Sequence, residues 1–540
     1  MLSDSYDYII VGAGSSGCAV ANRLSANPAY RVLVIESGPD DTSPLIKMPR
    51  GIGKLLAPGN PHVWDYMVSP GGNQPEEVWL KGRTVGGSSS VNGMVYMRGA
   101  PADYDGWEAL GCTGWGWDEI GPKFVALEDH QLGAGKDRGA GGPLKVTVHP
   151  RGNPLCAAMI EAAKQLGVAE VADVNGATAT ADGGIGFQTN SIAGGQRFSA
   201  ARAFLTPVRH RPNLTVLPQT DVLRILFDRT RASGVVVRDK SGERTIAAAR
   251  EIIVSAGAIQ SPKLLQLSGI GPAGLLSAHG IPIIADRPNV GKNLREHRYL
   301  STQYRVKGNS LNSRFLGLGL LQSVLDYFIR HKGPLTHSAH EVGGFVKTRP
   351  GLDRPDAQIG FGLYSVHADE GGVVVDKNPG ITILGYFTRP ESQGEIRIRS
   401  AAPDDKPIIE ANHFSAEIDR VAAVSLFRWL RALGQTPALA EWIIEETAPG
   451  PSIESDADIL DNALSLGGTS YHVSGTCRMG SDPESVVDPQ LRVRGVQGLR
   501  VVDTSIMPTL VSGNTNAPAM VIGMRAADFI LADATKALAA

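Results

Sequence analysis

Cysteine is scarce in this chain of 540 residues, which has four, and they stand far apart without CxxC spacing. This scarcity argues against a disulfide scaffold and favours a reducing compartment. An excess of charge of one sign is also missing, because 52 basic and 54 acidic residues leave a net charge of -2. Since no long basic run is present either, we do not expect nucleic acid as a partner.

Long apolar runs are absent as well. The most lipid-like segment, residues 315–321, is interrupted by two glycines and falls far short of the roughly 20 apolar residues that cross a bilayer. The first residues carry acids where a secretory signal would carry basic residues, so we interpret the start as mature protein. We therefore expect a cytoplasmic protein without a transmembrane span, for which peripheral contact with a membrane stays open.

The composition is that of a folded protein, with 42% hydrophobic and 20% charged residues. A chain of this length predicts about two to four domains. We predict no metal site.

The N-terminal segment has the pattern of a dinucleotide-binding unit. A β-rich run at 7–11 is followed by Gly12, Gly14 and Gly17 in GAGSSG, by a helical segment, and by a second strand that ends at Glu36. The three glycines permit a tight turn, close approach of a pyrophosphate, and close packing of helix on strand. The pyrophosphate would face the positive helix N-terminus, and Glu36 would bind ribose hydroxyls. The pattern fits NAD or FAD and disfavours NADP.

Three later segments add to this pattern. Residues 82–93, GRTVGGSSSVNG, form either a surface loop or a loop that lies against a cofactor. The apolar run at 251–254 predicts a strand that turns into a helix within SAGAIQSPKLLQLSG. Near the C-terminus, Asn516 is a candidate N-cap for a helix through residues 520–531, whose positive end would be free for an anion.

Taken together, the ordered segments resemble the glucose-methanol-choline (GMC) family of flavoprotein oxidoreductases. The resemblance runs from Tyr6 to about Ala532 and is carried by GAGSSG with Glu36, GRTVGGSSSVN, GAIQSPKLLQLSGIG, NVGKNLREH, YHVSGTCRMG with GLRVVDTSIMP, and NTNAPAM. It implies FAD as the cofactor. It also implies an α/β fold, α+β overall, in which a Rossmann-like FAD-binding domain is joined to a discontinuous substrate domain of antiparallel sheet and helices.

The resemblance also suggests where the domains lie. We expect the FAD-binding domain in residues 1–310, with a contribution to the substrate domain near 150–195. The substrate domain would occupy mainly 311–465, and residues 466–540 would return to the FAD-binding domain with the catalytic side chains. The alternating segment EIRIRS, residues 395–400, is expected in the substrate-domain sheet.

The resemblance gives His472 and Asn514 catalytic roles. A single histidine in a long chain is usually only packed or solvated, but in the family the two matching residues lie together over the flavin ring. Oxidation of an alcohol moves a hydride to flavin N5 and a proton to a base, and an imidazole suits the proton step. Asn514 would hold the substrate oxygen and orient the carbon.

Other roles implied by the resemblance concern the cofactor and the substrate. Contacts with FAD are expected from Gly86, Gly87, Val91, Asn92, Val222 and Asp503. Some relatives have a covalently attached histidine at the position of Val91, so we expect noncovalent FAD here. Asp503 is alternatively a carboxylate that caps a turn. Glu341 matches a residue that lines the substrate cavity of choline-oxidising relatives, but THSAHE offers no aromatic cage for a cation, so choline is not favoured.

The function that these features favour is an FAD-dependent alcohol dehydrogenase, an oxidoreductase acting on CH-OH donors. It would oxidise a primary or similar alcohol to the aldehyde and pass electrons to a quinone or another non-oxygen acceptor. An alcohol oxidase that uses O2 and releases hydrogen peroxide is the alternative, and a hydroxynitrile lyase that keeps FAD without redox use is a further one. Light-driven decarboxylation is disfavoured, because Thr388 rather than cysteine precedes Arg389-Pro390 and His472 is present. The particular alcohol and the oligomeric state stay open.

Overall fold

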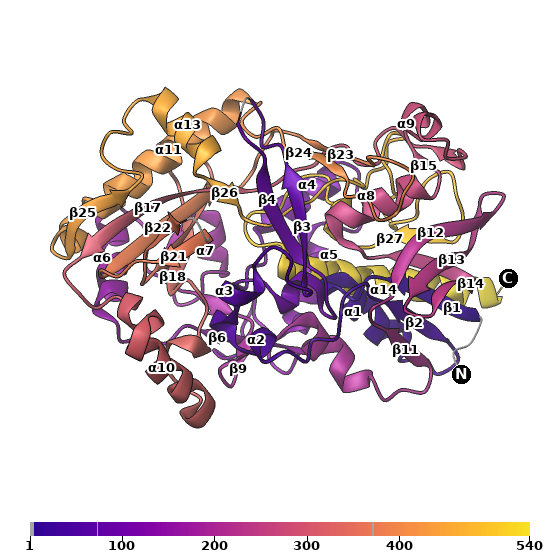
Figure 1. The fold of residues 1–540 in the computed structure, drawn as a ribbon, viewed down its shortest axis with the longest axis horizontal. Coiled ribbons are helices and arrows are strands. Elements are labelled where there is room, and N and C mark those ends of the chain that lie inside the picture. Colours follow the sequence, from indigo (N-terminus) through magenta and orange to yellow (C-terminus); the bar gives the residue numbers. More distant parts are fainter. Residues whose placement is uncertain (1–4, 73, 370–371, 540) are drawn as a thin grey trace.

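Short apolar runs build the first sheet. Strands β1 (Ser5–Val11) and β2 (Val32–Ile35) pair in parallel and are connected by helix α1 (Ser15–Leu24). Every residue of β2 is buried, as expected for a parallel strand covered on both faces. The computed structural model describes residues 5–72, 74–369 and 372–539. The predicted strand-helix-strand unit at the N-terminus is present (Figure 1).

Strand β14 (Gly242–Val254) is the centre of this sheet. The strand order is β11–β2–β1–β14–β13–β12, and β27 pairs with β14 outside this path. Along one edge, β14 pairs antiparallel with β13 near its start and parallel with β27 near its end, while its other edge pairs with β1. The further strands are β11 (Leu214–Leu217), β12 (Asp221–Asp228), β13 (Arg231–Asp239) and β27 (Leu499–Val501).

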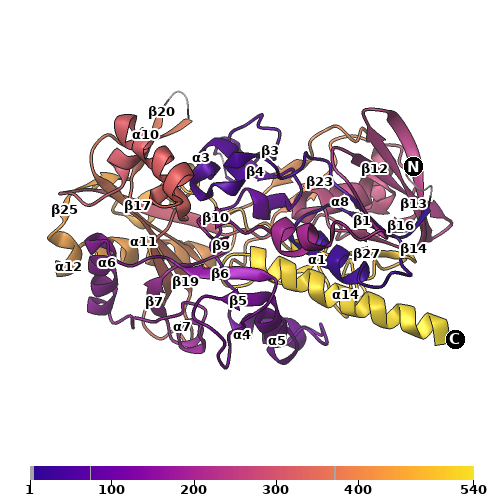
Figure 2. The ribbon, with the colours of Figure 1, turned by 90° about the horizontal axis from the view of Figure 1, so that it is seen from below.

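Two more helices complete this unit. Helix α8 (Gly257–Leu267) follows β14, and the long C-terminal helix α14 (Asn516–Ala539) packs along α1 (Figure 2). A Cβ at Gly523 would lie 2.4 Å from the carbonyl oxygen of Ser16, so only glycine lets α14 approach α1 this closely. The predicted C-terminal helix is thus present, with Asn516 as its first residue rather than its cap.

The second sheet is antiparallel and is assembled from distant parts of the chain. Its order is β25–β17–β22–β19–β18–β7, and β26 also pairs with β17. Helices α6 (Pro154–Gln165) and α11 (Glu417–Gly434) pack on it around a separate apolar core. The strands are β7 (Gly184–Phe187), β17 (Arg298–Val306), β18 (Val342–Val346), β19 (Ala357–Gly362), β22 (Gly380–Phe387), β25 (Ile443–Ala448) and β26 (Gly468–Thr469). The chain first enters this sheet at β7 and returns to it at β17.

One expectation about this sheet is wrong. The segment 395–400 does form a strand, β23 (Glu395–Arg397), but it pairs with β24 (Ile408–Glu410) in a separate ribbon. Its apolar side chain Ile396 packs in a small core with Tyr66 and Trp79, close to α8. Alternation of apolar and polar residues predicts a half-buried strand but does not say which strand it will pair with.

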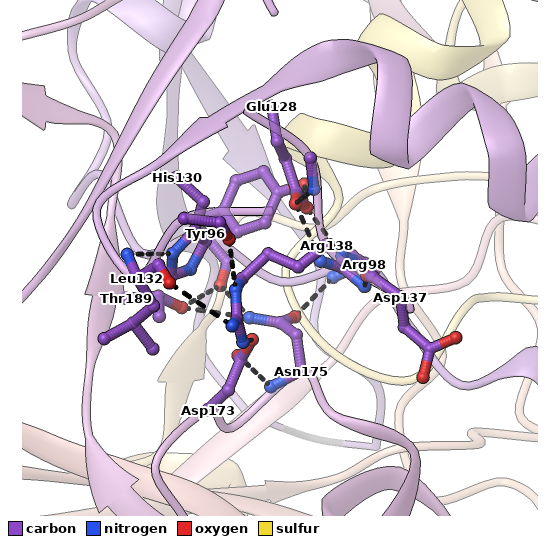
Figure 3. Close-up of polar contacts among 12 residues, drawn as sticks. Tyr96, Arg98, Glu128, His130, Leu132, Asp137, Arg138, Asp173, Asn175 and Thr189 are labelled. Atoms are coloured by element: carbon purple, nitrogen blue, oxygen red, sulfur yellow. Dashed lines mark hydrogen bonds and ion pairs between the residues drawn. The ribbon is translucent and has the colours of Figure 1, made fainter. Parts of the chain in front are cut away.

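A buried polar network fixes the segment that contains Tyr96 and Arg98 (Figure 3). The Arg98 guanidinium donates to both oxygens of Glu128 at 2.7 and 2.8 Å, and Tyr96 donates to the same carboxylate. Asn175 accepts from the backbone N–H of Arg98 at 2.9 Å and donates to Thr189. Because Arg98 and Glu128 are almost wholly buried, their charges compensate each other away from water.

Shorter elements complete the described chain. Among the described residues, none of the helices has both the length and the apolar character required to cross a membrane. The bounds of the shorter elements are α2 (Pro44–Lys47), α3 (Ile52–Leu55), α4 (Pro101–Ala109), α5 (Trp117–Leu127), α7 (Ala177–Ala181), α9 (Ala273–Ala278), α10 (Gly317–Leu325), α12 (Pro437–Ala440), α13 (Asp456–Ser465), β3 (Val63–Val68), β4 (Glu77–Gly82), β5 (Glu128–His130), β6 (Leu144–Val148), β8 (Thr189–Asn190), β9 (Ile192–Ala193), β10 (Gln196–Arg197), β15 (Ile270–Gly271), β16 (Ala285–Asp286), β20 (Val366–Asp369) and β21 (Gly372–Val375).

Candidate active site

The carboxyl ends of β1, β2, β14 and β27 meet at one edge of the first sheet. Gly12, Glu36 and Ser255 follow directly after three of these strands, and Asp503 lies two residues after the fourth. Ligands of open α/β sheets bind at this edge. A cavity of about 610 Å³ begins here and extends to residues of the second sheet.

Most residues predicted for the site line this cavity. The cavity brings together Gly12, Gly14, Glu36, Gly87, Val91, Asn92, Val222, Asp503, His472 and Asn514. Gly17, Gly86 and Glu341 are not among its lining residues.

Gly17 and Gly86 act on the backbone behind the cavity. A Cβ at Gly17 would lie 2.1 Å from the carbonyl oxygen of Gly12, so glycine is needed for α1 to start so close to β1. Gly86 has a φ of 90° and donates its N–H to Ala13 at 2.7 Å. This bond ties the 82–93 loop to the glycine loop after β1.

The glycine backbone forms a cradle that fits a dinucleotide. Gly14 and Gly257 line the cavity, and the space that a side chain would fill at each position is open. A Cβ at Gly257 would meet nothing within 4 Å, and one at Gly14 would make only a single contact at 3.7 Å. Residues at the N-terminal ends of α1, α8 and α14 line the same cavity. Because helix N-termini carry partial positive charge and unpaired N–H groups, this end of the cavity suits a diphosphate.

Glu36 is held by backbone donors at the end of β2. Its two carboxylate oxygens accept N–H groups of Ala13 at 3.0 Å and Gly38 at 2.9 Å. Burial raises the pKa of Glu36 to about 7, against the opposing effect of these two hydrogen bonds. Each carboxylate oxygen has more than one lone pair, so the side chain can also accept a ribose hydroxyl from a ligand in the cavity.

Asp503 caps the backbone and lines the cavity at once. Its carboxylate accepts from the N–H of Gly257 at 2.9 Å, the hydroxyl of Ser261 at 2.6 Å and the N–H of Ser505 at 2.8 Å. Burial raises its pKa. The contacts of Asp503 are therefore those of a carboxylate that caps a turn. They fix the N-terminus of α8 beside the cavity.

Val91 and Asn92 lie in the loop opposite this edge. Val91 packs with Leu55 and Leu80, and its side chain has no atom that could bond to a flavin. Asn92 accepts from the N–H of Met94 at 3.0 Å and from the buried Arg197 guanidinium at 2.8 Å. This loop thus presents a fixed wall to the cavity.

His472 and Asn514 meet at the other end of the cavity, although they are far apart in the sequence. His472 follows β26, and Asn514 stands two residues before α14. The amide nitrogen of Asn514 lies 3.0 Å from Nε2 of His472. The amide oxygen of Asn514 accepts from Gln358 at 3.1 Å, and the oxygen of Gln358 accepts from the hydroxyl of Tyr386 at 2.7 Å.

The hydrogen bonds around His297 determine which nitrogen of His472 carries the proton. Nε2 of His297 lies 2.9 Å from the carbonyl oxygen of Thr388, which only accepts, so this nitrogen donates. In a neutral imidazole the other nitrogen, Nδ1, must then accept. It lies 3.0 Å from Nδ1 of His472, which therefore carries a proton. Nε2 of His472 therefore carries a lone pair. This agrees with the position of the Asn514 amide, which donates an N–H to it.

Burial keeps both imidazoles neutral. It lowers the pKa of His472 well below its ordinary value, and nearby His297 and Lys81 lower it further. Burial also lowers the pKa of His297 to about 3. Glu296 accepts the backbone N–H of His472 at 2.8 Å, and burial raises the pKa of this carboxyl to about 7. At neutral pH the site therefore presents an unprotonated ring nitrogen to the cavity.

Glu341 lies behind the cavity wall rather than in it. Its carboxylate accepts from the Arg50 guanidinium at 2.6 Å and from the N–H of Leu363 at 2.9 Å. Both side chains of the ion pair are buried. Burial raises the pKa of Glu341 to about 7, while Arg50 acts in the opposite direction. The neighbouring His340, not Glu341, lines the cavity.

The sequence matches the models of two family domains, both described as GMC oxidoreductase, over residues 6–299 and 390–523. The chain belongs to the GMC oxidoreductase family. It is 40% identical to the alcohol dehydrogenase [acceptor] of Pseudomonas putida, covering 97% of this chain and 96% of the relative. It is 39% identical to the mitochondrial choline dehydrogenase of Homo sapiens, covering 98% and 90%.

A solved structure of this family has the same fold. The formate oxidase of Aspergillus oryzae RIB40, studied for its FAD modification, matches with a TM-score of 0.90 at 26% identity, over 98% of this chain and 99% of that one. The predicted α/β fold with an antiparallel second unit is confirmed, and so is FAD as the cofactor of this GMC oxidoreductase. Noncovalent attachment stays a prediction.

Sequence reasoning gave no role to three side chains of the site. His297 ends the segment NVGKNLREH, which carries part of the family resemblance. Gln358 and Tyr386 lie on β19 and β22 and look like ordinary strand residues in the sequence. A histidine at the end of a recognised motif was a signal for His297, whereas nothing local distinguished the other two.

Proposed function

We propose that this protein oxidises an alcohol to the aldehyde and passes the electrons to a quinone or another non-oxygen acceptor. The proposal rests on the meeting of His472 and Asn514 at the cavity, with Nε2 of His472 unprotonated. An unprotonated imidazole beside an amide donor suits removal of a hydroxyl proton. The similarity to the alcohol dehydrogenase [acceptor] supports the same assignment.

The residues of this chain divide the reaction between them. Asn514 donates its amide N–H to the substrate oxygen and so orients the reacting carbon. The substrate hydroxyl replaces the Asn514 amide at the lone pair of Nε2 of His472, which accepts the hydroxyl proton, while Nδ1–H of His472 stays hydrogen-bonded to His297. FAD, when bound, supplies the group that accepts the hydride leaving the carbon. Loss of one proton and one hydride converts the C–O single bond of the alcohol into the C=O bond of the aldehyde.

FAD would be held by residues that line the cavity. The glycine loop after β1 and the N-terminus of α1 suit the diphosphate, and Glu36 suits a ribose. Val91 and Asn92 would contact the part nearer to His472, Asp503 the flavin phosphate or the ribityl chain, and Val222 the adenine. Because Val91 offers no nucleophile, attachment at this position would be noncovalent.

An uncharged alcohol is the proposed substrate class. A quaternary ammonium needs an accessible anion or an aromatic cage, because a buried cation without one loses its hydration without compensation. The carboxylate of Glu341 is engaged by Arg50 and does not line the cavity, whereas the aromatic residues Tyr299, Tyr386 and Tyr471 do. Choline is the second candidate, favoured by 39% identity to a choline dehydrogenase.

Oxygen as the electron acceptor is the alternative to a quinone. It is supported by the similarity to formate oxidase. The choice does not alter the roles proposed for His472 and Asn514, because both reactions share the same oxidation of the substrate.

The test is anaerobic mixing of the purified yellow holoprotein with a panel of alcohols, followed by admission of air. We expect neutral alcohols to bleach the flavin, and slow recovery in air. Choline and its uncharged isostere, in which carbon replaces the ammonium nitrogen, form a matched pair; faster bleaching by choline would contradict an uncharged substrate. Rapid recovery with hydrogen peroxide would identify an oxidase, and no bleaching by any alcohol would reject the proposal.

Variants test the proposed base. His472→Ala should keep FAD and lose about 100- to 10,000-fold in the rate of flavin reduction. Asn514→Ala should lose less, because it removes orientation and not the base. The exposed histidine His210 provides the matched control, and His210→Ala should reduce at the wild-type rate. Reduction of His472→Ala at the wild-type rate would reject His472 as the base.

A further inference from the structure

One surface of α10 and of the helical segment η6 (Asp326–Arg330) that follows it is apolar and exposed. We call it the α10 face and define it by Leu318, Leu320, Leu321, Leu325, Phe328 and Ile329. Leu318 is 85% exposed and Ile329 71% exposed, and the others range from 40% to 55%. Single exposed apolar side chains are normal on a protein surface, but six within twelve residues form a contiguous patch of the kind that marks an interaction site.

The rest of the same segment is well packed, so the α10 face is held outward. Tyr327 is buried and packs with Met48 and Leu335. Ser323 is also buried and donates to the carbonyl of Arg314 at 2.9 Å. One side of the segment therefore anchors it to the molecule, and the opposite side carries the leucines and Ile329. Figures 1 and 2 both show α10 at the periphery of the second unit.

The segment that carries the α10 face is basic. Residues 307–340 contain the basic residues Lys307, Arg314, Arg330 and Lys332, and Asp326 is their acidic residue. Asp326 already pairs with Arg314 at 2.9 Å and with Arg330 at 3.1 Å. Lys47 on α2 and Lys54 on α3 are exposed on neighbouring elements. An occupant of this surface must therefore be apolar where it meets the leucines and anionic around them.

We propose that the α10 face docks onto the surface of an anionic phospholipid bilayer. Helices with leucine and phenylalanine on one side and basic residues beside them lie in the interface plane, with acyl chains under the apolar side and anionic headgroups against the basic residues. A two-fold dimer through the same patch would bring Arg330 and Lys332 of one copy near those of the other, so its charges match less well.

The docked orientation would bring the cavity towards the lipid. The chain that follows the α10 face runs through η7 (Pro334–Thr336) to Ala339 and His340, which line the cavity. On the neighbouring α3, Ile52 lines the same cavity. Apolar molecules that dissolve in the bilayer would thus enter from the membrane side. The docking itself does not depend on the proposed reaction, so the two can fail separately.

The experiment is co-sedimentation of the holoprotein with vesicles. Phosphatidylcholine vesicles are compared with vesicles that also contain phosphatidylglycerol, at low and high salt. We expect binding to the anionic vesicles that weakens with salt. Leu318→Asp with Ile329→Asp should lower the binding constant at least about tenfold. Arg330→Glu with Lys332→Glu should lower it about fivefold or more for each residue changed.

A matched control is Leu466→Asp, because Leu466 at the end of α13 is 71% exposed, as Ile329 is. It should bind as the wild type does, and all variants should keep their FAD content and their activity with a soluble electron acceptor. Absence of wild-type binding to either vesicle, or an equal loss in Leu466→Asp, would overturn the proposal. So would a dimer in light scattering that Leu318→Asp with Ile329→Asp converts to a monomer, since the occupant would then be a second copy.

Discussion

At the scale of single residues, the site depends on a hydrogen-bond chain that has a direction. The chain begins at the carbonyl of Thr388, which can only accept, and passes through His297 to His472. A second chain arrives from Tyr386 through Gln358 and Asn514. Both require the same protonation of His472, so the lone pair on Nε2 is specified twice.

His297 should therefore act as a positioning residue. His297→Leu leaves Nδ1–H of His472 buried without an acceptor, which frees the ring to turn, and we expect flavin reduction to slow by about 10- to 100-fold with little change in apparent substrate affinity. His297→Gln retains one acceptor and one donor and should restore most of the rate. Stopped-flow reduction at several alcohol concentrations measures both quantities. Equal losses in the two variants would mean that His297 only fills space.

The pH dependence of reduction follows from the burial of His472. Burial disfavours the charged imidazolium, so the pKa lies well below the ordinary value and protonation needs a lower pH. The active, neutral form should persist, and the rate of flavin reduction should stay level from pH 8 down to about 6.5 and fall only below it. Anaerobic reduction across this range provides the measurement. An acidic limb centred above pH 6.5 would contradict this assignment of the base.

How far the site could be predicted depended on where each side chain finds its partners. His472 and Asn514 were predicted because both stand in recognisable segments, and the structure brings them within 3.0 Å. The surroundings of Glu341 could not be predicted, because its partner Arg50 is 291 residues away and belongs to a different unit of the chain. Local sequence indicates that an acid is present, but not whether a distant cation already neutralises it.

At the scale of elements, the junction of β1 and α1 is a tight steric constraint. Gly17 has the close contact between helix and strand that is predicted for it, because this contact follows from local backbone geometry. The strand partner of 395–400 was predicted wrongly. Pairing of strands depends on long-range packing, which short patterns do not encode.

Gly17→Ala tests this junction. Its Cβ would overlap the carbonyl oxygen of Gly12 at 2.1 Å, so α1 must move away from β1, and we expect a loss of stability of about 1 to 3 kcal/mol together with weaker FAD retention. The matched control is Gly274→Ala in α9, where a Cβ meets nothing within 4 Å. It should be neutral or slightly stabilising. Thermal unfolding followed by flavin fluorescence compares the two, and equal effects would refute the steric argument.

At the scale of the whole molecule, the network around Arg98 and Glu128 holds several distant segments together. Arg98→Met should lower the free energy of unfolding by about 3 to 5 kcal/mol, because it leaves Glu128 as an uncompensated buried charge. Arg98→Met with Glu128→Gln removes that charge and should be less damaging than the single change. Urea unfolding followed by circular dichroism measures these differences.

An exposed ion pair supplies the control for this prediction. Arg305 and Glu445 lie 2.7 Å apart, but their side chains are 41% and 51% exposed. Arg305→Met should therefore cost less than about 1 kcal/mol. If it costs as much as Arg98→Met, burial is not the reason for the importance of the network.

The late position of β27 and α14 in the chain has a consequence for biosynthesis. β14 lacks one of its two parallel neighbours, β27, until residues 499–501 exist, and α1 lacks its cover until the residues of α14 have been made. A ribosome exposes the N-terminal strands first. The nucleotide-binding half, although it begins the chain, can therefore complete its fold and accept FAD only after nearly the whole polypeptide has been translated. A nascent chain stalled before residue 499 should carry no flavin.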